Sequence, residues 1–272
     1  MRTLHIPSQP RLAATVCGSG PLVIMIHGLG GDRSIWRPQL QGLKDHFTAV
    51  SLDLRGYGES DPAPLPLDFK KDFCADVIAT MDFFGAPRAH LVGLSMGGRV
   101  ARTTALQAPR RVASLILANT SPGFDHLDDA QAEAFIRSRS SFATDERLPP
   151  EFGRRQAAAM MADTASRQAL DAAARAMSTL RADHYLSVLR ASTIQDRGDK
   201  LETIGCPTLI IASDQDTVYP QAVTQELLAR IPHAASAVIA NAGHISNLEQ
   251  PQAFNEAILA FLKAQKNDSA YS

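Results

Sequence analysis

The spacing of the apolar residues constrains the fold of this chain more than any other feature. Short runs rich in branched apolar residues alternate with longer stretches in which apolar residues recur every three or four positions. The first pattern is typical of buried strands and the second of amphipathic helices. Their alternation predicts an α/β fold, in which a parallel sheet carries helices on both faces. The expected strands are residues 22–26, 48–52, 89–93, 114–118, 208–212 and 237–240.

This alternation stops in the stretch 124–200, which contains no strand-like run. Ala, Gln, Arg, Met and Leu dominate the stretch, and all of them favour helices. Turn-forming sequences flank it, Ser-Pro-Gly at 121–123 and Gly-Cys-Pro at 205–207. We therefore predict a core made of residues 1–123 and 201–272, with residues 124–200 inserted as a helical cap.

The composition is that of a folded globular protein, with 45% hydrophobic and 20% charged residues among 272. The net charge of −1 leaves no basic excess to neutralise phosphates, so nucleic acid is not expected as a partner. The longest apolar run, residues 22–26, is far too short to span a bilayer, and the first 20 residues lack the apolar stretch of a signal peptide. We expect a cytoplasmic protein with no membrane partner; the sequence leaves the oligomeric state open.

The three cysteines, Cys17, Cys74 and Cys206, are widely spaced and form no CxxC pair or Cys/His cluster. This spacing indicates reduced residues in the core, and no metal site is expected. A reactive thiol is the alternative, but none of the three has an obvious histidine or basic neighbour in sequence.

A Gly-Leu-Ser-Met-Gly sequence occupies residues 93–97, directly after the expected strand 89–93 and before a helix-like stretch at 99–108. A sharp turn from strand to helix would strain the backbone of Ser95 and raise its hydroxyl above the sheet, while the flanking glycines let neighbouring chain approach. The following helix would direct its N-terminal amides toward the same point. A plain tight turn is the alternative, but this context favours Ser95 as a nucleophile.

A serine hydroxyl is a weak nucleophile at neutral pH, so the chain must supply a base and a group that orients the base. His244 follows the last expected strand and is the predicted base. Asp216, in the polar loop after residues 208–212, completes the predicted catalytic triad of Ser95, Asp216 and His244. Asp214 is the alternative acid, because a loop aspartate often bonds the loop backbone instead. Six other histidines are interpreted as surface residues: His5, His46, His90, His126, His184 and His233.

Two backbone amides are expected to form an oxyanion hole. One belongs to Met96, the residue after the nucleophile, and the other to Leu29, in the glycine-rich loop after the first expected core strand. His27 begins that loop and is predicted to hydrogen-bond the loop rather than to react, because it precedes the nucleophile in the chain.

Over essentially its whole length the chain resembles the α/β-hydrolase superfamily. The matching features are His27-Gly28, residues 53–60, the Gly-x-Ser-x-Gly sequence, the loop residue Asp216 and Gly243-His244. The resemblance implies an eight-stranded, mostly parallel sheet with a helical cap inserted after the sixth strand. The related haloalkane dehalogenases and epoxide hydrolases use an aspartate nucleophile where this chain has Ser95, which argues against both.

Within the superfamily, residues 36–39, 115–120 and 244–251 are most similar to 3-oxoadipate enol-lactonases. This similarity implies hydrolysis of a small enol-lactone in aromatic catabolism, although the His27-Gly28 pair departs from the pattern of those enzymes. Three alternatives stay open. A carbon–carbon bond hydrolase of ring-fission diketones and a cofactor-free perhydrolase would need the same triad, and a noncatalytic binding protein can share the fold.

The expected reaction is hydrolysis of a small carboxylic ester or lactone through an acyl-enzyme, with no cofactor. The cap is expected to line the substrate pocket, although apolar residues at helical spacing are more often plain core. The candidate pocket walls are Trp36, Phe135, Met160, Met161 and Tyr185. An enol-lactone carries a carboxylate, for which the candidate partners are Arg33, Arg137 and Arg190.

Overall fold

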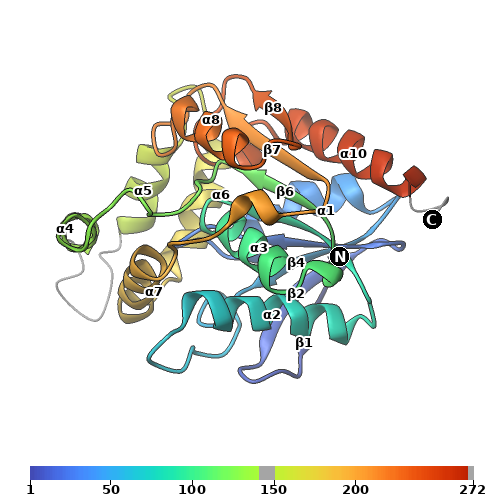
Figure 1. Cartoon of the computed structure of the whole chain (residues 1–272), viewed down its shortest axis with the longest axis horizontal. Coiled ribbons are helices and arrows are strands. Elements are labelled where there is room, and N and C mark those ends of the chain that lie inside the picture. Colours follow the sequence, from blue (N-terminus) through green and yellow to red (C-terminus); the bar gives the residue numbers. More distant parts are fainter. Residues whose placement is uncertain (141–150, 269–272) are drawn as a thin grey trace.

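The computed structural model describes residues 1–140 and 151–268. Its strands are β1 (Arg2–Ile6), β2 (Leu12–Cys17), β3 (Leu22–Ile26), β4 (Thr48–Asp53), β5 (Ala89–Leu94), β6 (Val112–Ala118), β7 (Thr208–Ser213) and β8 (Ala235–Ile239). They form one sheet in the order β1-β2-β4-β3-β5-β6-β7-β8 (Figure 1). β2 is antiparallel to both of its neighbours, and the other pairs are parallel. The expected eight-stranded, mostly parallel sheet is confirmed.

The central strands are apolar because both faces of the sheet are covered. β3 is buried along its whole length. Its side chains alternate between two hydrophobic cores, with Leu22, Ile24 and Ile26 in one and Val23 and Met25 in the other. Successive side chains of a strand point to opposite faces, so a strand covered on both sides must be apolar at every position.

Helices pack on each face, and the two sets contribute to different cores (Figure 1). One core includes side chains from α2 (Phe69–Phe83), α3 (Met96–Gln107) and α8 (Gln221–Arg230); the other includes α1 (Arg37–Leu43) and α10 (Pro251–Asp268). Each helix buries an apolar stripe. In α10 the stripe comprises Phe254, Ile258 and Leu262, all fully buried.

The edges of the sheet differ from the sequence expectation. The apolar pattern does not reveal β1 and β2, which form an antiparallel hairpin at one edge. β1 is mostly exposed and β2 is rich in Ala and Thr, so neither shows a run of branched apolar residues. At the opposite edge, β8 covers Ala235–Ile239 instead of the predicted 237–240, because an edge strand is only partly buried and its ends carry little apolar signal.

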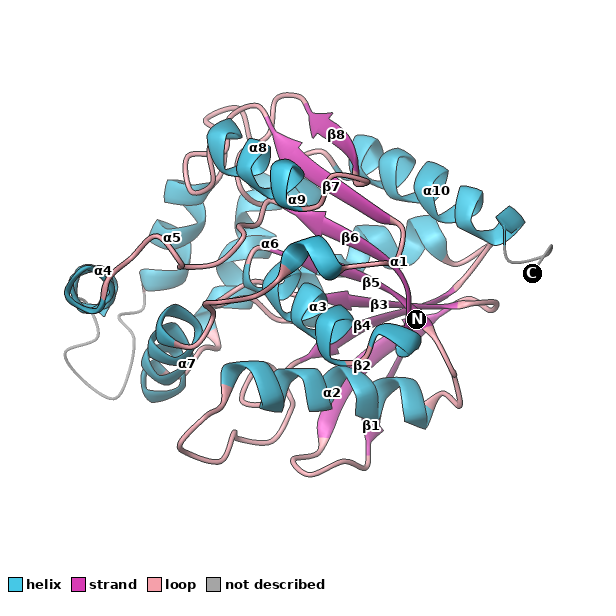
Figure 2. Cartoon of the chain, in the orientation of Figure 1, coloured by secondary structure: helices cyan, strands magenta, loops and turns pink. Residues whose placement is uncertain are grey.

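Between β6 and β7 the described part of the chain contains helices and no strand. These cap helices are α4 (Asp129–Ser140), α5 (Phe152–Met160), α6 (Arg167–Ser178) and α7 (Ala182–Ile194). α5 packs against α6, and α4 packs against α7. The cap helices gather at the end of the sheet to which the parallel strand arrows point (Figure 2).

The carboxyl ends of the parallel strands therefore face the cap helices. Loops after β3, β5, β6, β7 and β8 meet the cap helices around one cavity, which is where open α/β sheets bind ligands. Short elements complete the chain: α9 (Ser246–Glu249) and the 3₁₀ turns Arg33–Trp36, Pro109–Arg111 and Leu201–Thr203. Across residues 1–140 and 151–268, no helix combines the length and the apolar character needed to cross a membrane.

Candidate active site

Ser95 lies on a strained turn between β5 and α3. Its φ of 56° and ψ of −119° form a conformation that residues other than glycine rarely adopt. The turn requires glycines because a Cβ on Gly93 would lie 2.2 Å from the Gly97 carbonyl oxygen, and one on Gly97 would lie 2.1 Å from that of Ile26. Within residues 91–100 Ser95 alone is partly exposed. The turn thus presents the hydroxyl above the sheet.

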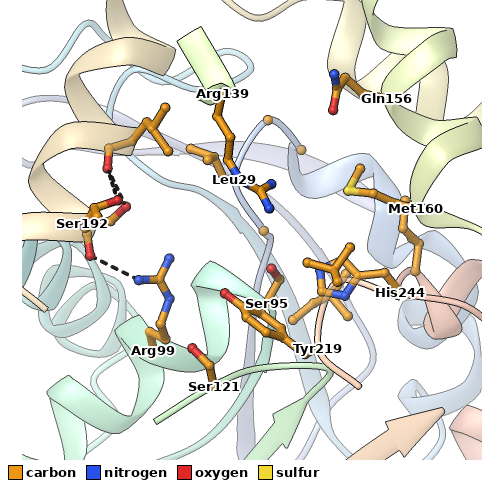
Figure 3. A pocket seen from close by; sticks show the side chains of 18 of the residues that line it. Leu29, Ser95, Arg99, Ser121, Arg139, Gln156, Met160, Ser192, Tyr219 and His244 are labelled. Atoms are coloured by element: carbon orange, nitrogen blue, oxygen red, sulfur yellow. Dashed lines mark hydrogen bonds between the residues drawn. The ribbon is translucent and has the colours of Figure 1, made fainter. Parts of the chain in front are cut away.

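A cavity of about 300 Å³ lies above Ser95, between the strand ends and the cap helices (Figure 3). Its walls are mainly apolar, and include Leu29 from the loop after β3 and Met160 from the end of α5. Polar groups that line it include Ser95, Arg99 and His244. A mainly apolar cavity with a few convergent polar groups is typical of a small-molecule site.

His244 follows β8, and its ring pairs with a buried carboxylate. Nδ1 lies 3.0 and 3.1 Å from the two carboxylate oxygens of Asp216, in the loop after β7. The Asp214 carboxylate has another role, since it accepts hydrogen bonds from the backbone amides of Asn241 and Ala242. The structure therefore pairs His244 with Asp216, and Nε2 is the ring nitrogen left for a reacting group.

Ser95 and His244 line the same cavity (Figure 3). No hydrogen bond between the described residues joins the Ser95 hydroxyl to the imidazole, and contacts of this kind often tighten only when substrate binds. The Tyr219 ring packs edge-on against the imidazole, with ring centroids 5.5 Å apart, and restricts its tilt.

Hydrogen bonds keep the Asp216 carboxylate ionised. Burial by itself would raise the pKa of Asp216, but the carboxylate faces His244 and accepts hydrogen bonds from the amides of Val218 and Tyr219 and from the Asn119 side chain. These contacts hold the pKa of Asp216 below its ordinary value. An ionised carboxylate at this position fixes the imidazole tautomer with the proton on Nδ1.

Asn119 is a positioning residue that the sequence pattern does not single out. It follows β6 with a φ of 45°. Its side-chain nitrogen donates to Ser213 Oγ at 2.5 Å and to Asp216 at 2.9 Å, and its oxygen accepts from Ser246 Oγ at 2.6 Å. One amide group thereby links the loops after β6, β7 and β8. The one feature of the sequence that includes Asn119 is the stretch 115–120, which is similar to 3-oxoadipate enol-lactonases.

The Glu249 carboxylate on α9 anchors the loop that carries His244. It accepts hydrogen bonds from the amides of Gly243 and Ile245, at 2.9 and 3.0 Å, which flank His244 on either side. It also accepts one from the Ala162 amide, just after α5, at 2.8 Å. Burial raises the pKa of Glu249, and these amide bonds oppose that shift. The carboxylate thus ties the histidine loop to the cap helices.

The structure indicates how the two amides expected to form the oxyanion hole are oriented. Met96 is the first residue of α3, so its N–H has no partner within the helix. Burial lowers the pKa of His27 and keeps the ring neutral; Nε2 accepts from the Leu54 amide, and Nδ1 lies 2.9 Å from the Gly28 carbonyl oxygen. The Gly28 carbonyl and the Leu29 N–H belong to the same planar trans peptide and point in opposite directions. The contact that holds the carbonyl oxygen toward the His27 ring therefore turns the Leu29 N–H away from that ring.

A family model for the alpha/beta hydrolase fold matches residues 21–251. The chain belongs to the α/β-hydrolase family. This hydrolase is 32% identical over 248 residues to 3-oxoadipate enol-lactonase 2 of Acinetobacter baylyi, covering 89% of each protein. It is 30% identical over 258 residues to RutD of Caulobacter segnis, whose name assigns it to the carbamate hydrolases, covering 89% of this chain and 91% of that one. A thermophilic esterase from Thermogutta terrifontis shares the fold, with a TM-score of 0.84 and 24% identity over 97% of this chain and 99% of that one.

Three of the predicted pocket walls, Phe135, Met160 and Tyr185, line the cavity of the hydrolase. The prediction for Trp36 is wrong. That side chain is fully buried and packs against Phe254, with ring centroids 6.0 Å apart, in the core beneath α10. Met161 is also absent from the described lining residues and packs in the same core. Apolar spacing alone does not say whether such a residue faces a core or a cavity.

The arginines predicted to meet a substrate carboxylate do not line the cavity. Arg33 forms ion pairs with two carboxylates at and after the end of β4, and Arg190 pairs with a carboxylate on α4. Arg137 is exposed on α4. Arg99 and Arg139 line the cavity instead. The sequence pattern does not identify Arg99, because the residues around a basic side chain inside a helix do not indicate which way that side chain points.

Two histidines interpreted as surface residues are buried. His90, in β5, has its Nδ1 2.8 Å from the Ser114 hydroxyl oxygen. His184, on α7, packs edge-on against Tyr57, with ring centroids 4.7 Å apart. All three cysteines are free, and Cys74 is buried while the other two are half-buried. In residues 1–140 and 151–268, no group of three or more His, Cys, Asp or Glu is placed to hold a metal ion.

Proposed function

We propose that this hydrolase cleaves a small carboxylic ester or lactone through a catalytic triad of Ser95, His244 and Asp216. The geometry of one cavity carries the proposal. A serine on a strained turn faces the same space as an imidazole whose Nδ1 is 3.0 Å from a buried carboxylate. This combination activates a hydroxyl for acyl transfer in enzymes on many folds.

In the first half-reaction, Ser95 Oγ attacks the substrate carbonyl carbon while its proton passes to Nε2 of His244. The Leu29 and Met96 amides hydrogen-bond the oxyanion of the tetrahedral intermediate. His244 then gives the proton to the leaving alkoxide or enolate oxygen as the C–O bond breaks, which leaves an acyl group on Ser95. In the second half-reaction, His244 takes a proton from water as the water oxygen attacks the acyl carbon. The bond between that carbon and Ser95 Oγ then breaks, the proton passes from His244 to Oγ, and the free carboxylic acid leaves. Asp216 remains ionised and holds the imidazolium.

We infer that 3-oxoadipate enol-lactone is the most specific candidate substrate. The 32% identity to 3-oxoadipate enol-lactonase 2 over 89% of each chain supports this inference. A cavity of about 300 Å³ suits a ligand of this small size. Turnover of this lactone would assign the protein to aromatic catabolism, and we propose that it acts there in the cytoplasm.

The test is a substrate panel with the wild-type protein and Ser95→Ala. The panel contains short 4-nitrophenyl esters, enol-lactones and ring-fission diketones, each assayed with and without hydrogen peroxide. The ring-fission diketones test for carbon–carbon bond cleavage. We expect the wild type to hydrolyse esters and an enol-lactone, and Ser95→Ala to lose at least about 1,000-fold in kcat/KM.

Each of the other outcomes would indicate a different function for this protein. Retained turnover in Ser95→Ala would place the nucleophile elsewhere. A preference for diketones would indicate carbon–carbon cleavage, and turnover that requires peroxide would indicate a perhydrolase. A folded wild-type protein that turns over nothing in the panel would favour a noncatalytic binding protein.

A further inference from the structure

Arg99 places a cation beside the candidate nucleophile. It is the fourth residue of α3, and Ser95 is the N-cap of the same helix. Four residues of α-helix rise about 6 Å, so the guanidinium stem starts one turn beyond the serine. Arg99 is 4% exposed and lines the cavity. Figure 3 shows its guanidinium group pointing into the cavity.

One side of this guanidinium is bound and the other is free. Nη1 donates to the Ser192 carbonyl oxygen at 3.1 Å and to Asp196 at 2.9 Å. Nη2 has no hydrogen-bond partner among the described residues, and Nε is buried without one. Nε and Nη2 form one edge of the planar guanidinium; Nε is enclosed by protein, so Nη2 is the nitrogen of this free edge that can donate a charge-assisted hydrogen bond to a ligand carboxylate.

Aromatic contacts fix the orientation of that edge. The Arg99 Cζ lies 5.5 Å from the centroid of the Phe69 ring and 4.9 Å from that of the Phe124 ring. Contacts of this kind stabilise the cation and limit its rotation. The free edge of Arg99 is therefore held in place before a ligand arrives, which reduces the entropy lost on binding.

The ion pairs around Arg99 leave a positive charge in excess. Asp196 pairs with both Arg99 and Arg102, and Asp199 pairs with both Arg102 and Lys70. Three cations thus share two carboxylates. Arg102 differs from Arg99 in two respects. Both of its terminal nitrogens face carboxylates, and its side chain is not among the described residues that line the cavity.

The charged residues along the rest of the described cavity wall do not cancel this excess. Arg139 adds a second cation, stacked over Phe135 with its Cζ 4.6 Å from the ring centroid. Glu226 is the acidic side chain among the described lining residues, and it is exposed to solvent, where its field is weakened. The charged side chains in the ion-pair cluster of Arg99, taken together, therefore carry a net positive charge.

We propose that the free edge of Arg99 binds a carboxylate of the substrate, so that the hydrolase acts on esters or lactones that carry a second, free carboxylate. This rests on the proposed function, because it assigns the substrate class of the same site. The carboxylate accepts a hydrogen bond from Nη2 and places the scissile carbonyl about one helical turn away, at Ser95. Arg99 is then a specificity-determining residue.

The experiment compares matched pairs of substrates. The charged members are the mono-4-nitrophenyl esters of succinate, glutarate and adipate, and the neutral members are 4-nitrophenyl esters of unbranched acids of similar length. Uncatalysed and intramolecular hydrolysis is subtracted with Ser95→Ala. The readout is the ratio of kcat/KM for the charged ester to kcat/KM for its neutral partner.

We expect the wild type to favour the best-fitting charged ester, and Arg99→Gln to lower the ratio by at least about 30-fold, mainly through KM. Arg102→Gln is the matched control, because it also removes a partner of Asp196 from the same helix but does not touch the cavity. Its ratio should stay within about 3-fold of the wild type. Equal loss of the ratio in both variants would mean that the ion-pair network, and not a carboxylate subsite, sets the preference.

A second measurement covers the case in which Arg99→Gln does not fold. On the wild-type protein, glutarate should inhibit hydrolysis of a neutral ester competitively, at a concentration at least about 10-fold lower than glutaramide. Equal inhibition by the two compounds, or a ratio unchanged in a folded Arg99→Gln, would overturn the proposal. A wild type that hydrolyses no ester would refute the proposed function instead, and calorimetric titration of Ser95→Ala with glutarate would then still test the subsite.

Discussion

At the scale of single residues, one loop gives two aspartates different tasks. Asp216 faces the imidazole of His244 and is held there by backbone amides, whereas Asp214 binds the amides of Asn241 and Ala242 in the turn that precedes the histidine. The two carboxylates are only two positions apart and belong to the same residue type. The direction of the backbone therefore decides which one orients His244.

This difference predicts unequal effects of the same substitution. Asp216→Asn should lower kcat/KM for 4-nitrophenyl esters by about 1,000-fold or more, because the amide no longer holds the proton of His244 on Nδ1. Asp214→Asn is the matched control and should cost less than about 10-fold, since asparagine keeps an oxygen that accepts from the loop amides. The assay is steady-state hydrolysis by both variants over a range of pH. A larger loss at Asp214 would transfer the orienting role to that residue.

At the scale of elements, the close approach of α3 to β3 shapes the site. Met96 begins α3 and Leu29 follows β3, so the gap between the two elements determines how far apart the two proposed oxyanion-hole amides lie. Gly97 forms this contact, and a Cβ there would lie 2.1 Å from the Ile26 carbonyl oxygen and 2.6 Å from that of His27. Both of these atoms belong to the backbone, so no flexible side chain could move to make room for the Cβ.

Gly97→Ala should therefore push α3 away from β3. We expect kcat/KM to fall by about 100-fold, as expected for a displacement of catalytic groups by about 1 Å, together with a lower Tm. Gly205→Ala is the control, because nothing lies within 4 Å of a Cβ at that position. Its stability should change by less than about 0.5 kcal/mol. Thermal unfolding and ester hydrolysis measure both effects, and full activity in Gly97→Ala would show that this contact does not set the oxyanion geometry.

At the scale of the whole molecule, the cap helices meet the core at a buried histidine. His184 on α7 packs so closely on the loop after β4 that a Cβ on Gly56 would lie 2.3 Å from its ring. Its Nε2 is buried with no hydrogen-bond partner in the described structure. Burial, only partly opposed by the nearby Asp183, lowers the pKa of His184 to about 4. The cap and core therefore pack around an uncharged imidazole.

A depressed histidine pKa makes stability depend on pH. Between about pH 4 and pH 6.5 the unfolded chain binds a proton that His184 does not bind in the folded state, so the free energy of unfolding rises with pH across this window. Acidification from pH 7 to pH 4 should cost up to about 3 kcal/mol through this residue. His184→Asn should remove that part of the slope in urea unfolding measured at several pH values. An equally steep slope in the variant would show that other groups cause it.

Local sequence patterns account for part of this molecule. The central strands are apolar on both faces, and the turn at Ser95 carries its glycines within five residues, so both can be predicted from the sequence. The orientations of Trp36 and Arg99 cannot. Trp36 faces the core because of Phe254, and Arg99 faces the cavity because Asp196 holds its other side. Those partners are distant along the chain, and no local pattern encodes such contacts.

The central claim is that Ser95 is a nucleophile activated by His244, and covalent labelling tests it most directly. The folded protein is treated with a fluorophosphonate, and the modified residue is located by mass spectrometry of its peptides. We expect a single phosphonylated residue, Ser95, and a labelling rate at least about 100-fold lower in His244→Ala. An unlabelled folded protein, or an adduct on another residue while Ser95 stays unmodified, would contradict the claim.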